Sequence, residues 1–264
     1  MYTGPTIITD GLVLYLDAAN PKSYPTTGTT WSDLSGNENN GTLINGPTFN
    51  LSNNGSIVFD GVNDYGSLGN SLGNGFSQIT VNAWINVASL GNNIARDVIS
   101  GCDGGSGGVP SVFNLSLLNL DNPLYLPSSF QGINIFFGIK PVGITRPIVI
   151  VDSSNYTAYL PGMAIAVNPI EFSYNKWINV CGVYTGTKTL LYINGVVKAD
   201  STLQPDGVNR SYSGTLNTTT TPRTVSNANR RFSGKISQTS IYNRALSDKE
   251  ILQNYNATKS RFNI

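Results

Sequence analysis

Apolar and polar residues alternate in many short runs along the chain, which is the period of a β-strand with at least one buried face. The clearest run is ITVNAWINV, residues 79–87, in which every odd-numbered residue is apolar. Trp84 lies on the opposite face of this run, among asparagine and threonine residues. Further strands are expected at residues 11–18 (GLVLYLDA) and 56–60 (SIVFD), so the pattern predicts an all-β fold of many short strands.

The second half of the chain continues this pattern. Short apolar stretches separated by proline- or asparagine-bearing turns fill residues 111–172 and predict more strands. Residues 177–184 and 189–197 form a predicted hairpin pair. Within the second of them, Asn194-Gly195 is a preferred dipeptide of two-residue turns, which require a positive φ.

One helix is predicted near the end of the chain. Ser247 and Glu250 have the spacing of a capping box, and Ile251, Leu252 and Tyr255 follow at positions that share a helical face. This face is expected to dock on the rest of the molecule. Because no linker or fixed-period repeat divides the sequence, residues 1–264 are expected to form a single domain.

Composition and charge exclude several classes of function. The chain has 16 lysine and arginine residues against 15 aspartate and glutamate residues, so no positive field is available for nucleic acid or an anionic membrane. It contains no histidine, which removes imidazole bases and the commonest zinc ligand. Cys102 and Cys181 are the only cysteines, and whether they form a disulfide is left open.

The first residues, MYTGPTIITDGLVLYLDAANP, have no basic segment ahead of a short apolar run that Asp10 and Asp17 flank. We therefore expect no signal peptide. No stretch reaches the ~20 apolar residues that a membrane helix needs. A protein of this kind that acts outside a cell is expected to leave by lysis, by another export route or as part of a particle.

Three segments together resemble the laminin G-like, concanavalin A-like jelly rolls, and in particular the form found in bacteriophage structural proteins. They are FDGVNDY at residues 59–65, WINVCGVYTGTKTLLYING at 177–195 and FSGKISQTSIYNRALSDKEI at 232–251. The resemblance implies an all-β, antiparallel two-sheet jelly-roll β-sandwich with one short C-terminal helix. Residues 101–172 are longer than a minimal domain of this kind needs and are expected to contain an insertion or elaboration.

The turn after the strand at residues 56–60 is a candidate calcium site. Asp60, Asn63 and Asp64 gather oxygen ligands there, as calcium sites at the rims of such jelly rolls do. Alternatively, Asp60 and Asn63 only bind the backbone N–H groups of the turn. Many relatives carry an acidic residue where this chain has Ser237 and Gln238, and this departure weakens the expectation of calcium.

Jelly rolls of this superfamily include glucanases, which need two carboxylates that flank a glycosidic bond. The glutamates Glu38, Glu171 and Glu250 stand singly, and no cluster of acidic residues occurs on any predicted strand. We therefore expect a protein that is not an enzyme, with glycoside hydrolysis as a remote alternative.

Aromatic and amide side chains supply candidate glycan-binding residues. Trp31, Tyr65 and Trp84 could stack on sugar rings, and Asn82 could bind hydroxyl groups. The alternative is that the tryptophans are packed in the core or under loops. The sequence leaves both interpretations open.

These observations and the resemblance predict a non-enzymatic virion structural protein, foremost a capsid decoration protein of a bacteriophage. It would be made in the host cytoplasm, lie on the virion surface, self-associate and bind capsid or fibre proteins, with an exposed face for host-surface polysaccharide. The alternative is a carbohydrate-binding adhesin or tail-fibre receptor-binding protein. Fold resemblance alone does not separate the two, because one sandwich supports many functions.

Overall fold

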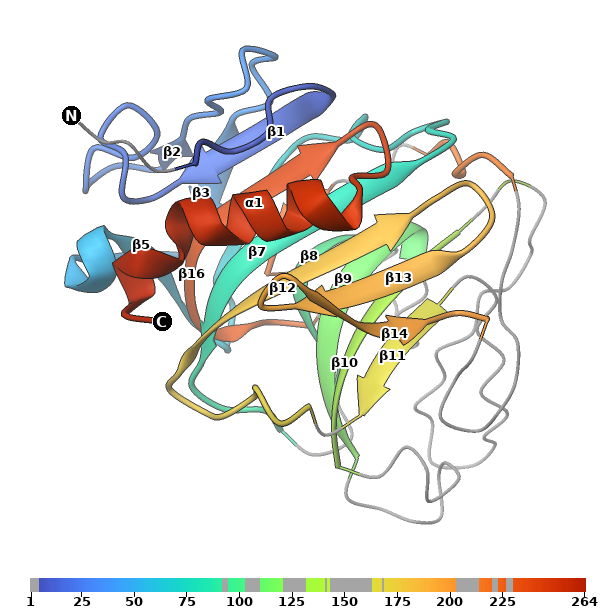
Figure 1. Cartoon of the computed structure of the whole chain (residues 1–264). Helices are drawn as coiled ribbons and strands as arrows, with labels where there is room; N and C mark the ends of the chain where they lie inside the picture. Colours follow the sequence, from blue (N-terminus) through green and yellow to red (C-terminus); the bar gives the residue numbers. More distant parts are fainter. Residues whose placement is uncertain are drawn as a thin grey trace.

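Two antiparallel β-sheets, packed face to face, and one C-terminal helix make up the protein (Figure 1). The computed structural model describes residues 5–91, 95–102, 110–120, 132–140, 142, 163–167, 169–202, 214–219, 223–226 and 230–264. This architecture confirms the all-β sandwich with a short helix that the sequence predicts.

Sheet A carries the C-terminal helix. In spatial order it contains β14 (Val196–Asp200), β13 (Thr189–Ile193), β12 (Trp177–Tyr184), β7 (Ile79–Val87), β16 (Ser233–Tyr242), β5 (Ser56–Asp60) and β4 (Thr48–Asn50). In addition, β1 (Leu12–Asp17) pairs with β16. Neighbouring strands are therefore often far apart in the sequence, as in a jelly roll.

Sheet B forms the second layer. Its order is β11 (Met163–Val167), β10 (Gly132–Ile139), β9 (Pro110–Leu120), β8 (Ala95–Cys102), β15 (Thr224–Val225), β6 (Tyr65–Ser67), β3 (Gly41–Ile44) and β2 (Thr30–Trp31). The strands β9, β10 and β11 come from residues 101–172, where an insertion is expected. Much of that segment lies outside the described residues, so the insertion stays a prediction.

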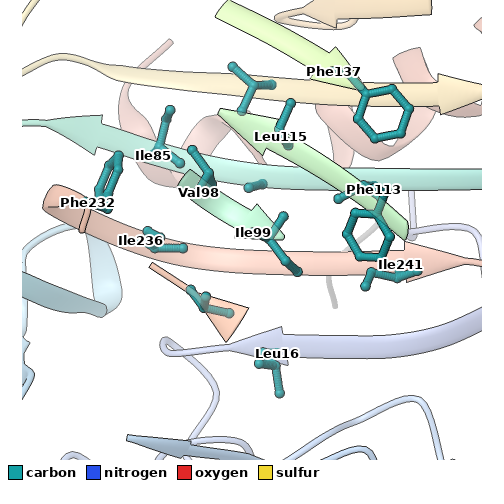
Figure 2. Close-up of a cluster of buried hydrophobic side chains, with 14 of the residues drawn as sticks. Leu16, Ile85, Val98, Ile99, Phe113, Leu115, Phe137, Phe232, Ile236 and Ile241 are labelled. Atoms are coloured by element: carbon teal, nitrogen blue, oxygen red, sulfur yellow. The ribbon is translucent and has the colours of Figure 1, made fainter. Parts of the chain in front are cut away.

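The core lies between the two sheets and is built by the alternation seen in the sequence. All five odd-numbered residues of β7 are buried in it, as predicted. Figure 2 shows side chains from both sheets meeting there, among them Ile85 and Ile241 of sheet A and Phe113 and Phe137 of sheet B. At about 25 cal/mol for each Å² of apolar surface buried, this layer is the main source of stability.

The predicted hairpin is also observed. Strands β12 and β13 pair in antiparallel register from Val180–Ile193 to Tyr184–Thr189. Asn194 and Gly195 then adopt φ values of 49° and 78°, which is the left-handed conformation that a two-residue turn of this kind requires. The turn divides the predicted strand 189–197 in two, and its last two residues begin β14, at the edge of sheet A.

Helix α1 (Asp248–Thr258) begins as the sequence predicts. The Ser247 side chain accepts a hydrogen bond from the amide of Glu250, and the Glu250 side chain accepts one from the amide of Ser247. The helix lies across the outer face of sheet A (Figure 1), with Ile251 buried against it. Leu252, predicted to share the docking face, is instead 44% exposed.

Cys181 is a free cysteine, buried on the outer face of sheet A beneath α1. It therefore forms no disulfide with Cys102 of β8, which settles the question that the sequence leaves open. Burial raises the pKa of its thiol far above the ordinary value. Within the described part of the chain, no helix has the length and apolar character that a membrane span requires.

Candidate functional site

The turn predicted to hold calcium is closed by its own backbone. One carboxylate oxygen of Asp60 accepts hydrogen bonds from the amides of Val62 (2.7 Å), Asn63 (3.1 Å) and Asp64 (3.4 Å). Partial burial would raise the pKa of Asp60, but these amides hold it below its ordinary value. This is the turn-capping arrangement that the sequence offers as the alternative to calcium.

Asp64 faces inward from the same turn. Its carboxylate accepts a hydrogen bond from the amide of Asp60 (3.0 Å), and burial raises its pKa. The backbone carbonyl of Asn63 accepts a hydrogen bond from the Asn45 side chain. Among the described residues, no group of three or more histidine, cysteine, aspartate or glutamate side chains is arranged to hold a metal ion.

Ser237, where the sequence resemblance leads one to expect an acidic residue, lies beside a guanidinium group. Ser237 accepts a hydrogen bond from Arg261 (2.8 Å) and donates one to the carbonyl of Gly55 (2.6 Å). The same guanidinium contacts both carboxylate oxygens of Asp17 at 3.0 Å. The Ser237 and Asp17 oxygens are therefore engaged by the Arg261 guanidinium.

The two tryptophans predicted to bind glycan are both fully buried. Trp31 belongs to the core between the sheets. Trp84 lies on the outer face of sheet A, where α1 and the residues after it cover the ring. Neither ring presents a face to solvent, so neither is placed to stack on a sugar, and the packing alternative describes both.

The other two predicted glycan-binding residues lie on different sheets. Asn82 is on the outer face of β7, beside Trp84, and is only 8% exposed. Tyr65 is half-buried on β6 of sheet B. The structure therefore does not bring the four predicted residues together, and Tyr65 is the one of them that is half-buried and not buried.

The outer face of sheet B instead carries a continuous row of small hydrogen-bonding side chains. Strand register places Ser67 opposite both Thr42 and Thr224, Thr224 opposite Ser100, and Ser100 opposite Asn114. Their sequence neighbours Leu43, Val225 and Leu115 point into the core. Because side chains alternate along a strand, the polar residues all face outward.

A second row runs beside the first. Asp97 of β8 lies opposite Ser116 of β9, whose hydroxyl donates to the Asp97 carboxylate (2.5 Å). Ser116 also accepts a hydrogen bond from the Asn114 side chain (3.2 Å). Arg230 pairs with the same Asp97 oxygen at 3.2 Å. These contacts join both rows into one hydrogen-bonded surface, here called the polar face.

Three buried atoms of the polar face have unused hydrogen-bonding capacity. Within the described part of the chain, they are the second carboxylate oxygen of Asp97, the side-chain oxygen of Asn114 and the hydroxyl of Thr224, each without a partner. Such atoms are rare in native proteins and each calls for an occupant such as a water or a ligand. They lie on three adjacent strands, β8, β9 and β15.

The polar face is open at one end. Thr42 is exposed and Ser67 half-buried, whereas Thr224 is 6% exposed and Ser100 and Asn114 are fully buried. Tyr65 belongs to the open end, because it lies two residues before Ser67 on the same strand and hence on the same side of the sheet. An aromatic ring therefore borders a row of hydroxyl and amide groups.

The polar face was not predicted, although the sequence contains part of its signal. In FNLSLLNL, residues 113–120, Asn114 and Ser116 alternate with apolar residues, as polar residues on the outward side of a strand do. What the pattern cannot give is the register that brings Asp97 and Thr224 beside them from other segments. That register depends on long-range pairing.

The sequence of the chain matches a family model over residues 59–252, more than half its length. The family is the concanavalin A-like lectin/glucanases superfamily. The chain belongs to this superfamily. The match shows the superfamily and does not extend to the phage origin that the sequence resemblance implies. No curated protein sequence is significantly similar to the chain.

Solved structures with the same superfamily fold include binding domains of several kinds. The binding domain of Paraclostridial mosquitocidal protein 1 matches with a TM-score of 0.58 at 20% identity, over 94% of this chain and 52% of that one. The binding domain of botulinum neurotoxin serotype D matches with 0.57 at 17% identity, over 94% and 52%. This chain thus spans about half of each toxin domain.

A third similar structure corresponds to this chain over almost its full length. Domain 4 of AbnA, an extracellular GH43 arabinanase from Geobacillus stearothermophilus, was solved in complex with arabinotriose. It matches with a TM-score of 0.58 at 15% identity, over 92% of this chain and 98% of that one. At such identities the likeness shows the fold alone.

Proposed function

We propose that this protein is a carbohydrate-binding domain that recognises glycans on the polar face of sheet B. The observation that carries the proposal is the open end of the polar face, where the exposed Thr42 and the half-buried Ser67 lie beside the half-buried Tyr65. Sugar hydroxyls are matched by such groups, and the apolar side of a sugar ring is matched by an aromatic face.

The comparisons support this class of function. Among proteins of similar fold are toxin binding domains and a domain solved with a bound arabino-oligosaccharide. That domain is nearly equal in length to this chain. A domain of similar fold and size was thus solved with a bound saccharide, which supports the proposal.

The proposed role is non-catalytic. Glycoside hydrolysis needs an acid and a second carboxylate on either side of one bond. Glu171 forms an ion pair with Lys198, and Glu250 forms one with Arg244. Neither lies on the polar face. Among the described residues, the carboxylate on that face belongs to Asp97, which is already paired with Arg230.

Arabinan provides the first probe, together with a panel of plant and bacterial polysaccharides in affinity electrophoresis. We expect Tyr65→Ala to weaken retardation by a bound polysaccharide about tenfold, since stacking of one ring contributes about 1–1.5 kcal/mol. Tyr174→Ala is the matched control, because Tyr174 is an exposed tyrosine (38%) in the loop before β12, away from the polar face.

Equal weakening by both tyrosine variants would mean that the polar face is not the binding surface. Failure of every polysaccharide to retard the wild-type protein would remove the carbohydrate-binding proposal itself. Isothermal titration with the best ligand then measures the affinity directly, and Asn114→Ala tests the buried end of the polar face.

We further propose a virion surface, foremost that of a bacteriophage capsid, as the place where this domain acts. One observation favours assembly on a particle: β14 is the edge strand of sheet A, and its Val196 and Val197 are 53% and 46% exposed. An edge strand with apolar residues is suited to association with another protein or a second copy. Immunogold labelling of purified particles tests this, and absence of label from heads and tails alike would contradict it.

A further inference from the structure

The open end of the polar face continues to the edge of sheet B as a row of hydroxyl side chains. Strand register places Thr30 opposite Thr42, and Thr42 opposite Ser67. Ser67 in turn lies opposite Thr224. These residues come from β2, β3, β6 and β15, which are neighbours in that order in sheet B. Each strand thus contributes one hydroxyl group to what is here called the hydroxyl row.

The side chains of the hydroxyl row point away from the core. Their sequence neighbours Trp31, Leu43 and Val225 are buried between the two sheets, and side chains alternate along a strand. The first two residues of the row, Thr30 and Thr42, are exposed. A ligand can therefore reach the row from the edge of the sheet.

The buried end of the hydroxyl row has unused hydrogen-bonding capacity. Thr224 is only 6% exposed, and its hydroxyl oxygen has no hydrogen-bond partner among the described residues. A buried hydroxyl in this state costs free energy and calls for an occupant that can bind it. A ligand that follows the row inward from the exposed edge would end at this atom.

An apolar strip borders the hydroxyl row. Ile44 lies directly opposite Tyr65, and each is two residues from a member of the row on its own strand. Both side chains are therefore on the outward side of the sheet, and both residues are half-buried. Hydroxyl groups with an apolar border fit a ligand that carries hydroxyls along its edge and C–H groups on its face, as a sugar ring does.

The spacing of the hydroxyl row selects among glycans. Neighbouring strands lie about 4.8 Å apart, so the four positions of the row repeat at that distance and span about 14 Å. Pyranose rings joined through equatorial bonds at C1 and C4 form an extended, flat ribbon in which each ring advances the chain by nearly this length. An axial bond at C1, as in amylose, curves the chain instead, so that it does not follow a flat sheet.

We propose that the hydroxyl row binds an extended β-1,4-linked glycan that lies across the strands, with about one sugar ring for each strand. This inference rests on the proposed carbohydrate-binding function and names the class of glycan by its linkage. One edge of the ribbon exchanges hydrogen bonds with the row and ends at Thr224. Its apolar face contacts Tyr65 and Ile44.

Isothermal titration with oligosaccharides of two to six rings tests the linkage and the length of the ligand. Cello-oligosaccharides are the first probe and chito-oligosaccharides the second, because both form the ribbon and they differ only at C2. We expect the affinity of at least one series to rise up to about four rings and then to level off, since the row has one position on each of four strands. Malto-oligosaccharides, which differ from the cello series in linkage alone, should bind about tenfold more weakly, because a curved chain reaches fewer of these hydroxyls.

Thr42→Val removes one hydroxyl from the row with little change of shape. We expect it to weaken binding of the four-ring ligand about threefold to tenfold, the effect of one hydrogen bond, with little change in melting temperature. Thr48→Val is the matched control, because Thr48 is an exposed threonine on β4, at the edge of the other sheet. It should bind as the wild type does. Thr42→Lys places a long side chain across the row and should abolish binding.

The outcomes separate this inference from the function on which it rests. Equal binding of the cello and malto series, an affinity that does not rise beyond two rings, or a Thr42→Val variant that binds as the wild type does would overturn the ribbon inference. Carbohydrate binding on the polar face would survive each of these results if Tyr65→Ala still weakened a bound polysaccharide. Absence of binding to every oligosaccharide and every polysaccharide of the panel would overturn both.

Discussion

The residues that cover the Trp84 side chain lie more than 170 positions further along the chain. Its indole N–H donates to the hydroxyl of Thr258 (2.8 Å), and its ring stacks on Phe262 with the centroids 4.1 Å apart. The local alternation places Trp84 correctly on the outer face of β7 but does not tell whether that face meets water or a helix. Side-chain direction was thus predictable, whereas the covering segment was not.

This environment makes Trp84 a stability residue. Replacement by phenylalanine removes the indole hydrogen bond and leaves unfilled space beneath α1, so we expect Trp84→Phe to lower the free energy of unfolding by about 1–3 kcal/mol. Urea denaturation followed by far-ultraviolet circular dichroism measures this. Glycan affinity should not change. A loss of glycan binding with unaltered stability would instead show that Trp84 belongs to the ligand-binding surface.

At the scale of the element, the start of α1 was predictable because its capping box is a local pattern. The structure adds partners that no local pattern contains: Arg244 forms ion pairs with Glu250 (2.7 Å) and with Asp10 (2.9 Å). Hydrogen bonds from Arg244, and then from Ser247, lower the pKa of Glu250 to about 2. The cap therefore also ties the helix to the strand that precedes it and to the N-terminal segment.

The lowered pKa of Glu250 predicts an acid-dependent contribution to stability. A group whose pKa is lower in the folded state stabilises that state fully above its unfolded pKa, near 4.5, and loses this contribution as the pH falls toward about 2. The difference in stability between the wild type and Glu250→Gln should thus be constant above about pH 5.5 and shrink below pH 4.5. Thermal unfolding from pH 2.5 to 7 measures it, and a pH-independent difference would contradict the assignment.

At the scale of the whole molecule, the sandwich was predictable because strand alternation and the family resemblance agree. The polar face was not, because its members come from β3, β6, β15, β8 and β9 and meet only through long-range register. The candidate calcium turn shows a different limit of sequence-based prediction. The same Asp60 oxygen that could bind a cation serves three amides of its own turn, and sequence alone does not rank the two uses.

The two outer faces of the sandwich have different roles. The outer face of sheet A is closed by α1 and the C-terminal residues, where Phe262 packs on Trp84 and Arg261 pairs with Asp17. The outer face of sheet B carries the polar face. Stability contributed by the first and ligand binding by the second should therefore be separable.

Phe262→Ala tests this separation together with Tyr65→Ala. Loss of a ring that is only 5% exposed is expected to lower the free energy of unfolding by about 3 kcal/mol and to leave the polysaccharide affinity within about twofold of the wild type. In the double variant, the changes in unfolding free energy should add to within about 0.5 kcal/mol, because distant sites without shared partners act independently. A larger coupling, or a polysaccharide affinity that falls with Phe262→Ala alone, would mean that closure of sheet A shapes the binding surface on sheet B through the core between them.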